Sequence, residues 1–171
     1  MLNQIINLFW TILSFTTVGV YWGQYFAEKR SPLILIVSVV ISVLIYVIPN
    51  QWLRKLAISN DKKMYERIGV KLLLYVVQNG TLVNRIQRKY YKKPGIIRNR
   101  KQAQDYLKTI LMQEKFHYCC FTLFLLSAVS AFSTQKPGIG LLIMLCNILY
   151  NVYPILLQQY NRLRIQKLLR L

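Results

Sequence analysis

Glu114 and His117 are the residues whose types and spacing best suit catalysis. Residues three apart share a face of a helix, so the carboxylate would orient the imidazole and raise its basicity. A histidine held in this way can act as a general base on a hydroxyl group. We therefore predict that both residues are catalytic. The alternative is an interfacial histidine whose carboxylate partner has no catalytic role.

Other arrangements of catalytic or metal-binding residues are missing from the sequence. His117 is its only histidine, whereas a zinc metalloprotease motif needs two, and Thr122 stands where a His-x4-Asp acyltransferase motif needs an aspartate. No glycine-rich phosphate loop and no Gly-x-Ser-x-Gly nucleophile motif occurs. The three cysteines lack disulfide or zinc spacing, so we expect reduced apolar side chains. We also expect no metal and no bound cofactor.

The last hydrophobic stretch carries polar residues that recur on one side of a helix. At 100° per residue, four of them fall within about 60°: Asn147, Asn151, Gln158 and Arg162. Amides in hydrocarbon need hydrogen-bond partners, so this polar stripe must face other helices or a polar cavity. It would serve either helix assembly or substrate binding. Pro154 would bend the helix and free a backbone carbonyl, which favours a site.

Three segments resemble motifs of the glycosyl-diaponeurosporenoate acyltransferase family. The stretch 147–164 is similar to the family's closing pattern, Asn-x-x-Tyr, Asn-x-Pro and Gln-Arg-Tyr-Asn-Arg-x-Arg. The stretches 65–69 and 114–118 resemble its aromatic-Glu-x-x-Gly and Glu-x-x-His-Trp motifs. The sequence departs from these patterns at Gln159, where the family has Arg, and at Tyr118, where it has Trp.

This resemblance implies a small bacterial membrane enzyme that moves a fatty acyl group onto a sugar hydroxyl, as in the last step of a glycosylated carotenoid pathway. His117 would deprotonate the acceptor hydroxyl, and Glu114 would orient His117. Eight further residues would hold the acceptor or the developing oxyanion: Glu66, Asn147, Asn151, Gln158, Tyr160, Asn161, Arg162 and Arg164. The candidate cosubstrates are acyl-CoA and acyl-carrier protein.

Two other functions stay open from the sequence. The protein could be a non-enzymatic accessory subunit or lipid-binding module, whose buried amides serve assembly alone. It could also act on another isoprenoid or on a peptide substrate. Cysteine chemistry is disfavoured, because no positive group is placed to activate Cys119 or Cys120 as a thiolate.

The elements that carry these residues follow from the distribution of charge. The 171 residues include 23 Lys+Arg and 5 Asp+Glu, a net charge of +18, yet 54% of them are hydrophobic. Four charge-free stretches of about the length that crosses a bilayer explain this combination: 1–27, 33–51, 118–135 and 137–161. The sequence thus predicts an all-α integral membrane protein with a single domain, 1–171. Its four transmembrane helices would lie at about 5–26, 33–49, 117–133 and 138–158.

Basic residues concentrate in the segment between the second and third helices and in the C-terminal tail. Two membrane crossings separate these parts, so both lie on the same side of the membrane. The segment between the second and third helices, 50–116, is expected to be basic and partly helical, and residues 51–117 hold 16 Lys+Arg. The tail, 159–171, holds 4 more. The positive-inside tendency makes this side cytoplasmic, so we expect a multi-pass protein of the bacterial plasma membrane with both termini in the cytoplasm. The first stretch lacks signal-peptide features, so we expect a retained helix.

The basic segment suggests the partners of the protein. We predict an interfacial helix at 64–77 and another helix from Arg100 to the third transmembrane helix. Between them, the basic run 85–100 would contact anionic membrane lipids, and it could dock acyl-CoA or acyl-carrier protein. A lipid-embedded substrate completes the expected partners. Nucleic acid is not expected, because no reading motif accompanies the charge.

Overall fold

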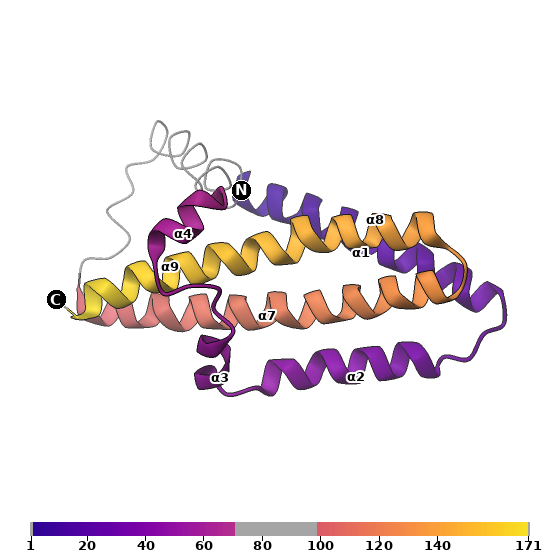
Figure 1. The fold of residues 1–171 in the computed structure, drawn as a ribbon, viewed down its shortest axis with the longest axis horizontal. Helices are drawn as coiled ribbons and strands as arrows, with labels where there is room; N and C mark the ends of the chain where they lie inside the picture. Colours follow the sequence, from indigo (N-terminus) through magenta and orange to yellow (C-terminus); the bar gives the residue numbers. More distant parts are fainter. Residues whose placement is uncertain (1, 71–98, 171) are drawn as a thin grey trace. The chain divides into compact units, whose positions relative to one another are not determined.

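Every regular element that the structure describes is helical, which confirms the predicted all-α class (Figure 1). The structure is a computed structural model, and it describes residues 2–70 and 99–170. Contacts within the chain separate it into two units. Unit 1 comprises Met1–Leu8, Asn50–Glu114 and Ile155–Leu171, and unit 2 comprises Phe9–Pro49 and Lys115–Pro154. The single domain over 1–171 stays a prediction.

Unit 2 is a set of helices in which α7 and α8 form a hairpin (Figure 1). Its elements are most of α1 (Leu2–Ala27), α2 (Leu33–Val47), the second half of α7 (Arg100–Ser133), α8 (Pro137–Asn147) and a π-helical turn, η1 (Ile148–Val152). Its core combines large aromatic and small side chains, among them Tyr21, Trp22, Phe124, Ala128, Ala131 and Tyr150. Small residues let helix backbones approach closely, as in bundles of membrane helices.

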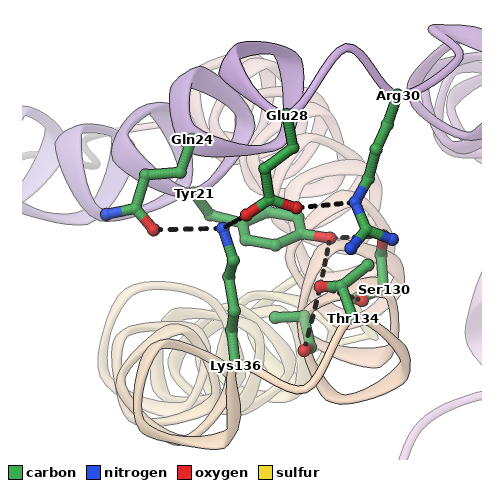
Figure 2. A network of polar contacts seen from close by, with 8 residues as sticks. Tyr21, Gln24, Glu28, Arg30, Ser130, Thr134 and Lys136 are labelled. Atoms are coloured by element: carbon green, nitrogen blue, oxygen red, sulfur yellow. Dashed lines mark hydrogen bonds and ion pairs between the residues drawn. The ribbon is translucent and has the colours of Figure 1, made fainter.

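A polar network joins the two short connections of unit 2, from α1 to α2 and from α7 to α8 (Figure 2). Glu28 forms ion pairs with Arg30 and Lys136, and Lys136 also donates a hydrogen bond to Gln24 at 3.4 Å. The hydrogen bond from Lys136, followed by that from Arg30, holds the pKa of Glu28 below its ordinary value. The network therefore fixes the α7–α8 turn to the end of α1.

Helix α2 has its polar residues inside and its apolar residues outside. Ser38 and Ser42 are buried, and each hydroxyl donates to a backbone carbonyl of its own helix at 2.7 Å. The exposed side chains of this helix are apolar and include Ile36, Val40 and Leu44. A soluble protein would cover such a face, so the pattern is typical of a helix that is surrounded by lipid.

The described part of unit 1 combines the start of α1 and the first half of α7 with α3 (Asn50–Lys55), α4 (Lys62–Arg67) and most of α9 (Tyr153–Arg170). Asp61 starts α4 as its N-cap, because its carboxylate accepts a hydrogen bond from the backbone N–H of Lys63 at 3.0 Å. Apolar contacts among Ala103, Ile110 and Ile165 join α7 and α9. These contacts position the polar residues of α9 within the unit.

Within residues 2–70 and 99–170, two helical stretches are long and apolar enough to cross a membrane, Arg100–Ser133 and Pro137–Leu169. Only 33% and 44% of their most apolar windows are buried, whereas a core helix of a soluble protein is mostly buried. The predicted helix that starts at Arg100 and the third transmembrane helix are one continuous element, α7. Four crossings and the orientation of the termini stay predictions. All three cysteines are free, as expected.

Part of the basic segment lies outside the described residues. The predicted interfacial helix at 64–77 overlaps α4, which ends at Arg67, and its part beyond residue 70 is not described. Of the basic run 85–100, the structure describes only the last two residues. Docking of lipids or an acyl donor on this run therefore stays a prediction.

Candidate functional site

Most of the predicted site residues fall into two polar clusters, one in each unit. The His117 cluster lies in unit 2 and comprises His117, Asn147 and Asn151. The Glu114 cluster lies in unit 1 and comprises Tyr65, Glu66, Glu114, Gln159, Tyr160 and Arg162. The two residues predicted as a catalytic pair are therefore three positions apart on α7, but each binds a partner in its own unit.

The His117 cluster is a chain of hydrogen bonds that ends on a backbone carbonyl. Asn147 donates from its Nδ2 to the carbonyl of Phe121 at 3.1 Å. The Oδ1 of Asn147 accepts from the Nδ2 of Asn151 at 2.8 Å, and the Oδ1 of Asn151 lies 3.4 Å from the Nδ1 of His117. Both asparagines are buried, whereas His117 is half-buried and so keeps access to its surroundings.

The direction of this chain sets the tautomer of His117. A carbonyl can only accept, so the Nδ2 of Asn147 must point at Phe121, and its Oδ1 then receives the Nδ2 of Asn151. The oxygen of Asn151 that faces His117 is an acceptor, so the Nδ1 of His117 carries a hydrogen. In the neutral imidazole the lone pair is then on Nε2. The chain thus leaves Nε2 as the nitrogen that can accept a proton.

A π-helical turn and a following proline shape the helix next to His117. Pro154 has no N–H, so the carbonyl of Tyr150 lacks the donor that a regular α-helix would supply. The rings of Tyr150 and His117 are 5.7 Å apart in an edge-on arrangement. The turn itself, Ile148–Val152, is of a kind that often occurs at functional sites. The carbonyl that the sequence predicts Pro154 to free is therefore that of Tyr150, and its part in a site stays a prediction.

Glu114 pairs with Arg162 in the interior of unit 1. The Nη1 of Arg162 donates to the Oε2 of Glu114 at 2.7 Å, and the two side chains are 3% and 0% exposed. A short charge-assisted hydrogen bond offsets part of the hydration that each charge loses on burial. Arg162, which the sequence assigned to the acceptor, is therefore engaged by a carboxylate of its own chain.

Gln159 is a buried polar residue that the sequence reasoning did not select. Its Oε1 accepts hydrogen bonds from the hydroxyl of Tyr65 at 2.9 Å and from the N–H of Ile58 at 3.3 Å. Its Nε2 donates to the carbonyl of Leu56 at 3.4 Å. Burial raises the pKa of Tyr65, so the hydroxyl keeps its proton at neutral pH. Gln159 thereby fixes the connection between α3 and α4 to α9.

The π-helical turn explains why Gln159 is buried while Gln158 is not. A π turn holds more residues than an α turn, so the inner face of the following helix moves by one position from the 100° spacing. The polar stripe accordingly continues at Gln159 and Arg162. Gln158 is half-buried and donates to the Oε1 of Gln113 at 2.9 Å. The only sign in the sequence was that position 159 departs from the family motif.

Two motif segments that are far apart in the sequence meet at Tyr160. Its hydroxyl donates to the Oε1 of Glu66 at 3.3 Å, and Lys62 forms an ion pair with Glu66 at 3.4 Å. The Nζ of Lys62 and the Cζ of Arg164 lie 5.6 and 5.7 Å from the centre of the Tyr160 ring. The structure thus brings three predicted site residues together here. The fourth in this region, Asn161, is half-buried on α9.

A model of the glycosyl-4,4'-diaponeurosporenoate acyltransferase family matches residues 49–171. No curated protein and no solved structure matches the chain. The matched range holds every residue that was predicted as catalytic or substrate-binding, from Glu66 to Arg164. Both polar clusters therefore consist of residues within the matched range.

Proposed function

Because the chain belongs to the glycosyl-4,4'-diaponeurosporenoate acyltransferase family, we propose that it transfers a fatty acyl group to a hydroxyl of a lipid-embedded acceptor. Family membership is the observation that carries this proposal, since it indicates acyltransferase activity. The His117 cluster supports it independently, because it offers a nitrogen base with a defined tautomer. The acceptor that we propose is a glycolipid, by analogy with the glycosylated carotenoid in the family's name.

We propose that the enzyme is a multi-pass protein of the bacterial plasma membrane, with four crossings and both termini in the cytoplasm. The two long apolar stretches and the outward apolar face of α2 support this location. Helix α1, with 26 residues, exceeds the about 20 that a crossing needs. The concentration of basic residues in 51–117 and 159–171 supports the orientation.

The proposed reaction starts with the Nε2 of His117 removing the proton of the acceptor hydroxyl. The hydroxyl oxygen attacks the carbonyl carbon of an acyl thioester, and the bond between that carbon and sulfur breaks. His117 then returns the proton to the departing thiolate, so the products are an ester and a free thiol. Asn151 and the ring of Tyr150 hold the imidazole during both transfers. The thioester would come from acyl-CoA or acyl-carrier protein.

The roles that the sequence assigned to unit 1 stay predictions within this proposal. The sequence assigned Glu114 the role of orienting His117, but the carboxylate of Glu114 accepts a buried hydrogen bond from Arg162. Within unit 2, Asn151 already orients the imidazole. Binding of the acceptor by the remaining predicted residues is likewise untested: Glu66, Asn147, Gln158, Tyr160, Asn161, Arg162 and Arg164.

The proposal is tested with purified protein, a radiolabelled acyl thioester and an extract of bacterial lipids. We expect wild-type protein to form an acylated lipid, and His117→Ala to lower the rate by about 10²- to 10⁴-fold, the usual contribution of a general base. Cys119→Ala is the matched control, because this half-buried residue lies two positions further along the same helix. Wild-type rates in His117→Ala would contradict the role of the histidine, and a comparable loss in Cys119→Ala would point to thiol chemistry.

A further inference from the structure

A cavity of about 920 Å³ opens in unit 1 between the start of α4 and the end of α9. Three cationic side chains line it: Lys62, Arg164 and Lys167. Two amide side chains, Asn60 and Gln166, add hydrogen-bond donors to the same wall. The volume is within the range of sites for small molecules, which is about 300 to 1,000 Å³. The cavity therefore has the size and the donors for a small anionic ligand.

The acidic residues of the chain balance only part of this positive charge. The sequence has five of them: Glu28, Asp61, Glu66, Asp105 and Glu114. Each has a partner in the described part of the chain, and none of these ion pairs includes Arg164 or Lys167. Asp61 also lines the cavity, and its carboxylate accepts the N-cap hydrogen bond of α4 and keeps its negative charge. Among the described residues Arg164 and Lys167 thus form no ion pair, and the lining of the cavity keeps a net positive charge.

Aromatic support holds one of these cations in place. The guanidinium of Arg164 lies 5.7 Å from the centre of the Tyr160 ring, and the hydroxyl of that ring is anchored to Glu66 at 3.3 Å. An arginine that rests on a fixed ring loses less freedom when it binds a ligand. Its planar fork matches the two oxygens of a phosphate group, which explains why an arginine suits this position.

We propose that this cavity binds a phosphate-bearing ligand, with Arg164 and Lys167 as the principal contacts. A phosphate group carries the negative charge that the two cations attract, and its oxygens can accept hydrogen bonds from the two amides. Two leucine side chains on the same wall, Leu163 and Leu168, suit an attached apolar chain. The identification of this ligand as the acyl donor rests on the proposed function, whereas the phosphate site itself does not.

The same chemistry could come from a soluble coenzyme or from a lipid headgroup, and binding assays separate the two. The full chain in dodecyl maltoside micelles is titrated with coenzyme A in one series and with phosphatidylglycerol in another. The test variant is Arg164→Gln with Lys167→Gln. The control is Arg54→Gln with Lys55→Gln, which removes the same charge from exposed positions on α3 of the same unit.

We expect the test variant to weaken binding of one probe by about 10-fold or more, with the control close to wild type. Loss of coenzyme A binding identifies a soluble donor, and loss of phosphatidylglycerol binding identifies a headgroup site. The proposal is overturned if wild-type protein binds neither probe, or if the control loses as much affinity as the test variant. Should the double variant not fold, Lys167→Gln alone, at an exposed position, gives the same comparison.

Because binding is measured without turnover, this result is independent of the transferase assay. Acyl transfer without coenzyme A or phosphatidylglycerol binding would leave the proposed function intact and remove the phosphate site. Binding without acyl transfer would support the phosphate site and contradict the proposed function.

Discussion

The buried pair of Glu114 and Arg162 offers the sharpest test of how unit 1 is held together. The two charges are joined by one hydrogen bond of 2.7 Å and are almost completely removed from solvent. Without Arg162, the buried Glu114 carboxyl must either stay ionised without a partner or take up a proton, and the loss of one partner of such a pair costs about 3–5 kcal/mol of unfolding free energy. We therefore expect Arg162→Met to lower the free energy of unfolding by this amount.

Helix α7 supplies a matched control in its exposed pair of Asp105 and Lys108. Their contact is 3.2 Å long, and the lysine and aspartate side chains are 79% and 58% exposed. An exposed pair contributes about 0–1 kcal/mol, so Lys108→Met should change stability by no more than that. The assay is unfolding in mixed micelles of increasing dodecyl sulfate content, followed by tryptophan fluorescence. Equal losses for Arg162→Met and Lys108→Met would refute the reasoning.

The double variant Glu114→Gln with Arg162→Met separates structure from catalysis. With both charges removed, no buried ion is left unpaired, and we expect the double variant to be more stable than Arg162→Met by about 2 kcal/mol or more. If Glu114 acts only through this pair, the refolded double variant keeps most of its acyl transfer. If it orients His117, as the sequence alone suggested, transfer is lost although the protein is folded.

Three other predictions concern unit 2. A Cβ on Gly140 would come within 2.9 Å of the Phe132 ring, so Gly140→Ala should lower the unfolding temperature, whereas Gly138→Ala, with open space, should not. The basic partners of Glu28 depress the pKa of its carboxyl, so Glu28 stabilises the fold at pH values above its unfolded-state pKa. This contribution is lost as the pH falls below about 4.3. Glu28→Gln should therefore abolish this part of the pH dependence of unfolding. Asn151→Leu removes the acceptor at Nδ1 of His117, and kcat should fall by about 10-fold or more with little change in KM; an unchanged kcat would argue against the hydrogen-bond chain.

The sequence predicts the helices of this protein better than their partners. Charge-free stretches identify α1, α2, the second half of α7 and α8, while the bounds of the membrane crossings stay predictions. The spacing of Asn147 and Asn151 also correctly places both on one buried face. These features depend on local composition and helical periodicity, which a sequence carries directly.

Two features could not be predicted from the sequence: the long-range partner of Glu114 and the π-helical turn. Glu114 suggests an interaction with His117 three positions away, but its observed partner is Arg162, 48 positions away. Likewise, Gln158 fits the regular spacing, while one turn of π-helix moves the buried position to Gln159. A helical wheel assumes one residue spacing throughout and says nothing about neighbouring helices, so neither feature could be derived from it.

The most direct test of the central claim is to identify the product of the reaction. Wild-type protein is incubated with an acyl thioester and a glycolipid extract, and mass spectrometry locates the added acyl group. We expect an ester on a hydroxyl of the lipid acceptor, formed by wild-type protein and about 10²-fold less by His117→Ala. Folded wild-type protein that forms no such ester from acyl-CoA or acyl-carrier protein, or an equal yield from His117→Ala, would contradict the proposed general-base acyl transfer.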